Sequence, residues 1–345
     1  YADSEGIQHA DTLRPWAYRY RDYVIRALNL DKPYDLFLLE QIAGDELANY
    51  QDADEFSEEH LDRLVATGFL RMVEDGTNAN ITNFVPDRQD NIDNEMRVLG
   101  SSVLGLTLHC AKCHSHKFDP LSQADYFRLR AIFKGAFDEH DWLNPAKRRL
   151  PFGHPDELKR WHENKAAVDA EVVAIKANEG LDEEAKKKAL EVAEKKRIEQ
   201  PMVRALWDRG QPSPTYLFNR GDYLQPRELI EPGLPRALVS SEEIFRAKPP
   251  WQGSGKTGRR LAFAEWLTKG VHPLTARVMV NRLWKHHFGR GLVRTLGDFG
   301  KAGERPSHPQ LLDWLATEFV EAEWSIKRMH RLILTSRTYR QTSRV

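Results

Sequence analysis

Apolar residues recur at the spacing of an α-helix through most of the N-terminal third of the chain. Residues 14–30 carry such a stripe and predict a helix. Ser57 and Ser122 each precede a further stripe at the position of an N-cap. Residues 74–94 are rich in Asn, Asp and Gly and predict a loop, whereas residues 92–108 regain the helical spacing. A helical N-terminal unit follows from this pattern.

The middle of the chain has a different composition. Residues 155–200 are dominated by Lys, Glu and Ala. Trp161, Val168 and Ile175 recur there every seven residues, and Gly180 interrupts the pattern. We therefore predict a helical hairpin with a narrow apolar seam. Its charge is typical of a solvated face, although such a hairpin could also dock a partner.

The C-terminal part returns to helical spacing after an irregular stretch. Residues 201–257 hold many Pro and Gly residues and predict an irregular crossing. Ser307 is expected to cap one of the later helices, which we place at residues 258–269, 273–288, 308–321 and 325–336. The predicted fold is mainly α, with two helical domains joined by the charged hairpin and the crossing. The predicted units are 1–137 (helical domain), 138–214 (hairpin and linker) and 215–345 (C-terminal helical domain).

Charge and hydropathy exclude two classes of partner. Lys plus Arg and Asp plus Glu are balanced at 51 each, so no basic surface for nucleic acid or an anionic membrane is predicted. The longest apolar run, around residues 103–108, is too short to span a bilayer. The chain opens at Tyr1 without a Met or a signal-peptide pattern, and it stops abruptly at Val345. We expect both ends to be cut from a longer polypeptide, so targeting stays open.

Both cysteines of the chain lie in one short motif, Cys110-Ala111-Lys112-Cys113-His114. This spacing is typical of covalent haem attachment. Two thiols three residues apart can each add to one vinyl group of the porphyrin, and the following histidine then binds the iron. The motif predicts haem c with thioethers at Cys110 and Cys113 and with His114 as proximal ligand.

Other kinds of site use the same residue types. Zinc is the chief competitor, because thiolate and imidazole suit Zn²⁺. Two of the nearby histidines His109, His114 and His116 would then complete the site with the cysteines. A second cysteine pair is usual in such sites, and the chain has none. A redox dithiol is expected within a βαβ pattern, which is missing from the sequence, and an inert disulfide is the remaining alternative.

The sixth ligand of a haem iron decides its chemistry. A His or Met there gives an electron carrier, and an open position gives ligand binding or peroxide chemistry. His287 is the first distal candidate, because it ends an apolar, Trp-containing stripe in the helix expected at 273–288. His286 beside it is the second, and a core histidine satisfied by a hydrogen bond is the plainer interpretation. The further candidates are His308, His330 and His140.

One glycine-rich stretch imitates a phosphate-binding loop. Gly253-Ser254-Gly255-Lys256-Thr257 has the end of that motif, but Pro250 stands where its first glycine should be. No apolar strand precedes the stretch either. We expect a turn without nucleotide binding.

Several longer runs of the chain match those of a known family. In the N-terminal part they include Gln41-Ile42-Ala43-Gly44-Asp45, Ala66-Thr67-Gly68-Phe69 and Cys110 to Pro120 (CAKCHSHKFDP). In the C-terminal part they include Gly221-Asp222-Tyr223, His286-His287-Phe288-Gly289-Arg290-Gly291 and Tyr339-Arg340-Gln341. With these runs the sequence resembles the planctomycete-type cytochrome c proteins, in which a second cytochrome-like domain precedes a conserved domain of unknown function.

The resemblance implies a secreted or envelope-associated haem protein, often with another cytochrome domain upstream. Cys110 and Cys113 would be its thioether sites and His114 its proximal ligand, and His286 and His287 fall on a family motif. We therefore expect a periplasmic or extracellular c-type cytochrome that exchanges electrons with a redox partner protein or a neighbouring cytochrome domain. A carrier is favoured over a catalyst, and no catalytic residue is assigned. The alternatives are a haem enzyme with an open iron position and a zinc-stabilised binding module.

Overall fold

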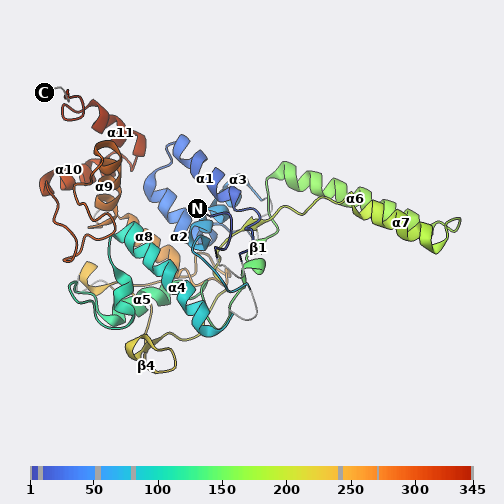
Figure 1. Ribbon diagram of the computed structural model, residues 1–345, viewed down its shortest axis with the longest axis horizontal. Coiled ribbons are helices and arrows are strands. Elements are labelled where there is room, and N and C mark those ends of the chain that lie inside the picture. The colour runs from blue at the N-terminus through green and yellow to red at the C-terminus, as the bar shows by residue number, and fades with distance from the viewer. Residues whose placement is uncertain are drawn as a thin grey trace.

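The computed structural model describes residues 2–6, 11–50, 56–78, 83–239, 244–269 and 272–342 (Figure 1). These residues are mainly helical, as the apolar spacing predicts. The α-helices are α1 (Tyr18–Asn29), α2 (Tyr34–Leu47), α3 (Glu58–Ala66), α4 (Val85–Leu99), α5 (Gln123–Phe133), α6 (Pro155–Ala177), α7 (Glu183–Glu194), α8 (Arg259–Thr268), α9 (Thr275–Phe288), α10 (Pro309–Glu321) and α11 (Ile326–Thr335). None of these helices is long and apolar enough to cross a membrane.

Two short antiparallel strand pairs interrupt the helices. They pair β1 (Arg149–Leu150) with β2 (Val203–Arg204), and β3 (Tyr216–Phe218) with β4 (Pro226–Leu229). In the described part of residues 201–257 the chain otherwise forms turns and extended segments, as its Pro and Gly content predicts. The β3–β4 hairpin matters most here, because it reaches the cysteine motif.

Two helix starts follow the predicted capping chemistry. The Ser57 hydroxyl accepts a hydrogen bond from the His60 amide at 3.2 Å and begins α3. The Ser122 hydroxyl accepts one from the Asp125 amide at 3.1 Å and begins α5. Each side chain satisfies an amide that has no partner within its helix.

The prediction of a loop over residues 74–94 is wrong for its second half. α4 begins at Val85, with Pro86 in its first turn. The Asp87 carboxylate accepts a hydrogen bond from the Phe84 amide at 2.9 Å and caps this end. Among the polar residues that follow on the helix, Gln89, Asn91, Asp93 and Glu95 are buried, whereas Asp90 is exposed. Polar composition was therefore a poor guide to exposure here.

The helix expected over residues 92–108 ends earlier than predicted. After α4 the chain makes a π-helical turn, η3 (Gly100–Leu104), and leaves it at Gly105 with φ of 60°. A Cβ at Gly105 would lie 2.8 Å from the Phe299 ring and 2.9 Å from Val278. The Gly105 carbonyl also accepts the Phe299 amide at 2.7 Å. This glycine therefore lets the segment before the motif pack closely on α9 and on the loop that follows α9.

The four C-terminal helices lie where the periodicity predicts them, within two residues at most ends. The prediction of Ser307 as the N-cap of α10 is wrong, because His308 is the residue that precedes the first helical residue, Pro309. Ser307 instead contacts the preceding segment, where its amide donates to the Leu292 carbonyl at 2.9 Å.

The predicted helical hairpin is formed by α6 and α7, which extend together away from the remaining helices (Figure 1). Only Val168 of α6 and Ala193 of α7 are buried within these two helices. The apolar seam is therefore narrow, as the seven-residue spacing indicates.

The largest hydrophobic core draws side chains from both helical parts, from Tyr34 to Ile333. α2 packs against α8. The Arg260 guanidinium of α8 donates to both carboxylate oxygens of Asp45 at 2.8 and 2.9 Å and to the Ile42 carbonyl at 2.9 Å. Arg260 and Asp45 are both fully buried. The two parts thus share one interior, and the domain boundaries at residues 137 and 215 stay predictions.

The end of the chain also closes on its beginning. The Tyr34 amide donates to the Trp324 carbonyl at 3.1 Å. The Asp31 carboxylate accepts hydrogen bonds from the Ser325 hydroxyl at 2.6 Å and from the Lys327 amide at 3.0 Å. The start of α11 is therefore attached to the segment between α1 and α2.

Candidate functional site

The cysteine–histidine motif begins on a short 3-10 turn, η4 (Leu108–Lys112), just before α5. Leu108 and Ala111 are buried and anchor the turn to the core. Cys110, Cys113 and His114 are exposed, and both thiols are free. The structure therefore presents the three predicted site residues to solvent within five positions of the chain.

The imidazole of His114 is oriented by one local hydrogen bond. Its Nδ1 lies 2.7 Å from the Ser115 carbonyl oxygen. A carbonyl can only accept, so this bond assigns the proton to Nδ1 and leaves the Nε2 lone pair free. Histidines that bind metals commonly use this arrangement, because the second ring nitrogen fixes the tautomer.

The neighbouring histidines differ from His114. The side chain of His116 is almost fully buried, and its Nδ1 accepts the Asp119 amide at 2.8 Å and the Phe118 amide at 3.3 Å. Its Nε2 therefore carries the proton and donates to the Thr107 hydroxyl at 3.0 Å. Both nitrogens of His116 hold the loop together, whereas His109 is exposed.

Lys112, between the two cysteines, takes part in a polar network below the motif. Its Nζ forms an ion pair with Asp93 and lies 3.5 Å from Asp90. Burial lowers the pKa of Lys112, but the Asp93 carboxylate outweighs it and the pKa is raised. Asp93 also accepts the Tyr126 hydroxyl and lies 3.8 Å from Arg130. The lysine side chain is thus held by α4 and is charged at neutral pH.

A turn from a distant part of the chain lies against the motif. Gly221, between β3 and β4, has φ of 78°, and a Cβ there would lie 2.9 Å from the Cys113 sulfur. The Gln123 side-chain amide donates to the Lys112 carbonyl at 2.9 Å and to the Phe218 carbonyl at 2.7 Å. The β3–β4 hairpin is therefore part of the site. Sequence reasoning did not place it there.

Of the distal candidates, His286 and His287 lie in the last turn of α9 and His330 lies on α11. Nε2 of His287 is 2.8 Å from Nδ1 of His330. His286, His308 and His140 are exposed. Among the described residues no contact joins His287 or His286 to the motif, so the distal assignment stays a prediction.

The glycine-rich stretch at residues 253–257 forms turns and extended chain, as expected. Its Lys256 is buried, donates to the Asp45 carbonyl and lies 4.4 Å from the centre of the Tyr50 ring. Burial lowers the pKa of this lysine despite the carboxylate of Asp45. The lysine points into the protein and is not available to a phosphate.

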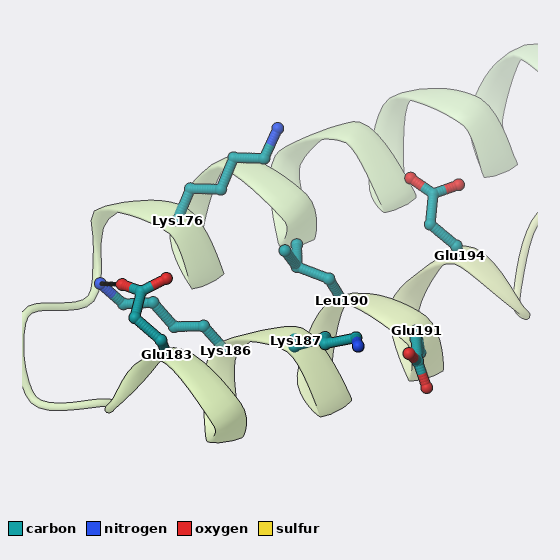
Figure 2. A pocket seen from close by; sticks show the side chains of 7 residues that line it. All are labelled: Lys176, Glu183, Lys186, Lys187, Leu190, Glu191 and Glu194. Atoms are coloured by element: carbon teal, nitrogen blue, oxygen red, sulfur yellow. Dashed lines mark ion pairs between the residues drawn. The ribbon is translucent and has the colours of Figure 1, made fainter.

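A hollow of about 500 Å³ between α6 and α7 offers little for a ligand (Figure 2). Leu190 is the one apolar side chain in its lining, and the others are lysines and glutamates. Glu183 and Lys186 lie 4.0 Å apart as an exposed ion pair. The hairpin surface is therefore solvated and of mixed charge. Within the described ranges no group of three or more His, Cys, Asp or Glu side chains is arranged to hold a metal ion.

Fold and motif together define a mainly helical protein with an exposed Cys-x-x-Cys-His segment between a π-helical turn and a helix. Residues 1–137, which contain the motif, match the family model PSCyt2, and residues 259–345 match the model PSD1. Each is described as a protein of unknown function, DUF1549 and DUF1553 respectively. No curated protein and no solved structure matches the chain. The family resemblance is thereby confirmed in part, since both segments are present and neither description names a cofactor.

Proposed function

We propose that the protein is an extracytoplasmic c-type cytochrome that carries electrons through one haem attached at Cys110 and Cys113. The observation that carries the proposal is that the motif presents two thiols and one imidazole nitrogen that are not bound to other groups. Its two thiols are free and exposed, and the hydrogen bond from Nδ1 leaves Nε2 of His114 available as a ligand. A bound haem supplies a one-electron couple whose potential depends on its axial ligands and surroundings.

The residues around the thiols support this attachment. Ala111 is buried and Lys112 is drawn toward Asp93, so neither residue between the cysteines covers them. Addition of each thiol across a vinyl group breaks the S–H bond and the π bond of the vinyl group and forms one C–S and one C–H bond, so the step consumes no oxidant. The partner is a redox protein or a neighbouring cytochrome domain, because a single haem has no second redox centre in the described chain.

A haem enzyme with an open iron position is the second candidate. One contact favours this candidate. Nε2 of His287 is hydrogen bonded to His330, so His287 would have to give up this bond before it could fill the sixth position of the iron. A zinc-stabilised module has less support. His116 would have to give up its bonds to Thr107 or to the amides of Phe118 and Asp119 before it could bind zinc, so such a site would depend on His109 and His114.

The attachment is tested by producing the chain, fused to a secretion signal, in a bacterium that matures c-type cytochromes. We expect haem to remain with the polypeptide on a denaturing gel and to give a c-type band in alkaline pyridine with dithionite. Cys110→Ser/Cys113→Ser should abolish covalent haem. His109→Ala is the matched control, because this exposed histidine adjoins the motif. Colourless wild-type protein that contains one zinc ion would overturn the proposal.

The two haem candidates are separated by the spectrum of the ferric protein. A six-coordinate, low-spin spectrum is expected for the carrier, and His287→Ala should convert it to a five-coordinate form if His287 is the distal ligand. A high-spin spectrum that changes on addition of cyanide or peroxide would favour the enzyme. An unchanged spectrum in His287→Ala would remove this residue as a ligand.

A further inference from the structure

The turn between β3 and β4 is built more rigidly than a connecting loop requires. The Asn219 amide donates to the Gln225 carbonyl at 3.0 Å, and the two side-chain amides meet at 2.8 Å. The Asp222 carboxylate accepts the Leu224 amide at 3.0 Å and the Gln225 side chain at 2.7 Å. These bonds hold the turn in one conformation.

The same turn places a non-glycine residue in a strained backbone conformation. Arg220 has φ of 54°, in the left-handed region that favours glycine. Residues held there persist only when their surroundings fix them, and they occur preferentially at functional sites. Arg220 adjoins Gly221, whose backbone approaches the Cys113 sulfur. The strain therefore lies directly beside the motif.

The charge of Arg220 has no carboxylate partner among the described residues, unlike that of two other cations near the motif, Lys112 and Arg128. Lys112 is paired with Asp93. Arg128 is paired with Asp125 at 3.0 Å. Arg220 is exposed, and within the described residues no ion pair or hydrogen bond of its side chain is found. A carboxylate bound beside this turn would therefore not have to displace an existing partner of the guanidinium.

From these contacts we propose that the turn Asn219–Asp222 is a wall of the cofactor site, in which Gly221 leaves room for a thioether at Cys113 and Arg220 binds the porphyrin carboxylates. The inference rests on the proposed haem attachment. Arginine suits the second role because its planar guanidinium can bind a carboxylate through two hydrogen bonds. Gly221 and Arg220 are positioning and binding residues and take no part in electron transfer themselves. Both lie outside the two segments that match family models.

The role of Gly221 is tested with Gly221→Ala in protein matured in the same bacterial host. The control is Gly253→Ala, because Gly253 also has a positive φ of 81° but has no atom within 4 Å of an added Cβ. We expect Gly221→Ala to lose the thioether at Cys113 and keep the one at Cys110. Peptide mass spectrometry should then find haem on Cys110 alone, and the pyridine band should move to longer wavelength because one vinyl group remains. Gly253→Ala should carry both thioethers.

A measurement without haem checks the same contact. In protein made in a host without haem attachment, a bulky maleimide should label Cys110 faster than Cys113, because the turn lies against the Cys113 sulfur. Shortening the turn by deletion of residues 220–222 should make the two rates similar. Equal rates in the wild type would contradict the described contact and overturn the role of Gly221.

The role of Arg220 is tested by the haem reduction potential of Arg220→Ala, with Arg227→Ala on the same hairpin as control. Loss of a cation beside the haem stabilises the ferric form, so the potential should fall in Arg220→Ala and more at low than at high salt. Equal potentials in the two variants would overturn this role. Full double attachment in Gly221→Ala would overturn the first role and leave the cytochrome proposal intact. Wild-type protein without haem would overturn the cytochrome proposal and, with it, the roles of Gly221 and Arg220.

Discussion

Replacing Arg260 by alanine is expected to destabilise the protein severely, because Arg260 pairs with the buried Asp45 carboxylate and lies beside the buried Glu46 side chain of α2. It donates to Asp45 at 2.8 and 2.9 Å, and its Nη2 lies 3.3 Å from Glu46. All three side chains are at most 1 % exposed. The substitution leaves the Asp45 carboxylate without this cation in a site that water does not reach, and the Glu46 side chain beside it.

The size of the effect follows from that burial. Removal of one partner of a buried ion pair costs about 3–5 kcal/mol when the remaining charge loses its compensation. Lys256, whose Nζ lies 3.9 Å from Asp45, compensates only part of that charge. A natural protein has only about 5–15 kcal/mol of unfolding free energy in total. Arg260→Ala should therefore lose about a fifth or more of the stability. By contrast, Arg277 and Asp313 form an exposed pair at 2.7 Å, and Arg277→Ala should cost at most about 1 kcal/mol.

Urea unfolding at pH 7, followed by tryptophan fluorescence, measures both variants against the wild type. The double variant Arg260→Met/Asp45→Asn should recover part of the loss, because it removes both charges of the pair. A cost of less than about 1 kcal/mol for Arg260→Ala would refute the reasoning. So would a double variant less stable than Arg260→Met alone.

Three further outcomes are expected. Burial raises the pKa of Glu46 to about 8, so the folded state binds its proton more tightly than the unfolded state. Stability should therefore fall as the pH rises from about 5 to about 8, and Glu46→Gln should flatten this dependence of Tm on pH. Gly105→Ala forces a Cβ against Phe299 in a left-handed backbone, so we expect a loss of about 1–3 kcal/mol by urea unfolding. Val168→Asp should reduce the helical circular dichroism of the hairpin, whereas Val173→Asp, on the exposed side of the same helix, should leave it unchanged.

Periodicity predicted most of the helices because their apolar faces pack on one interior. The start of α4 was missed because residues such as Gln89 and Asn91 are polar yet buried, and composition alone cannot distinguish them from a solvated loop. The motif could be predicted residue by residue, since its chemistry depends on local spacing. The approach of Gly221 to Cys113 could not, because it joins residues more than a hundred positions apart.

The candidate histidines show the same limit. Sequence reasoning selected His287 and His330 separately, each as a possible ligand. The structure pairs them with each other at 2.8 Å, through helices α9 and α11. Helical spacing indicates which face of a helix is buried, but the neighbour on that face depends on how the helices pack.

The attachment of α11 to the segment before α2 sets an order of events during synthesis. The bonds from Ser325 and Lys327 to Asp31 join residues nearly three hundred positions apart. About 210 residues separate Cys113 from Lys327, and at roughly 5–20 residues per second a ribosome needs about 10–40 s to make them. Throughout that interval the emerging chain carries both thiols while its interior is incomplete. The cysteines are thus open to enzymes that act on nascent or newly exported chains well before the native contacts around them exist.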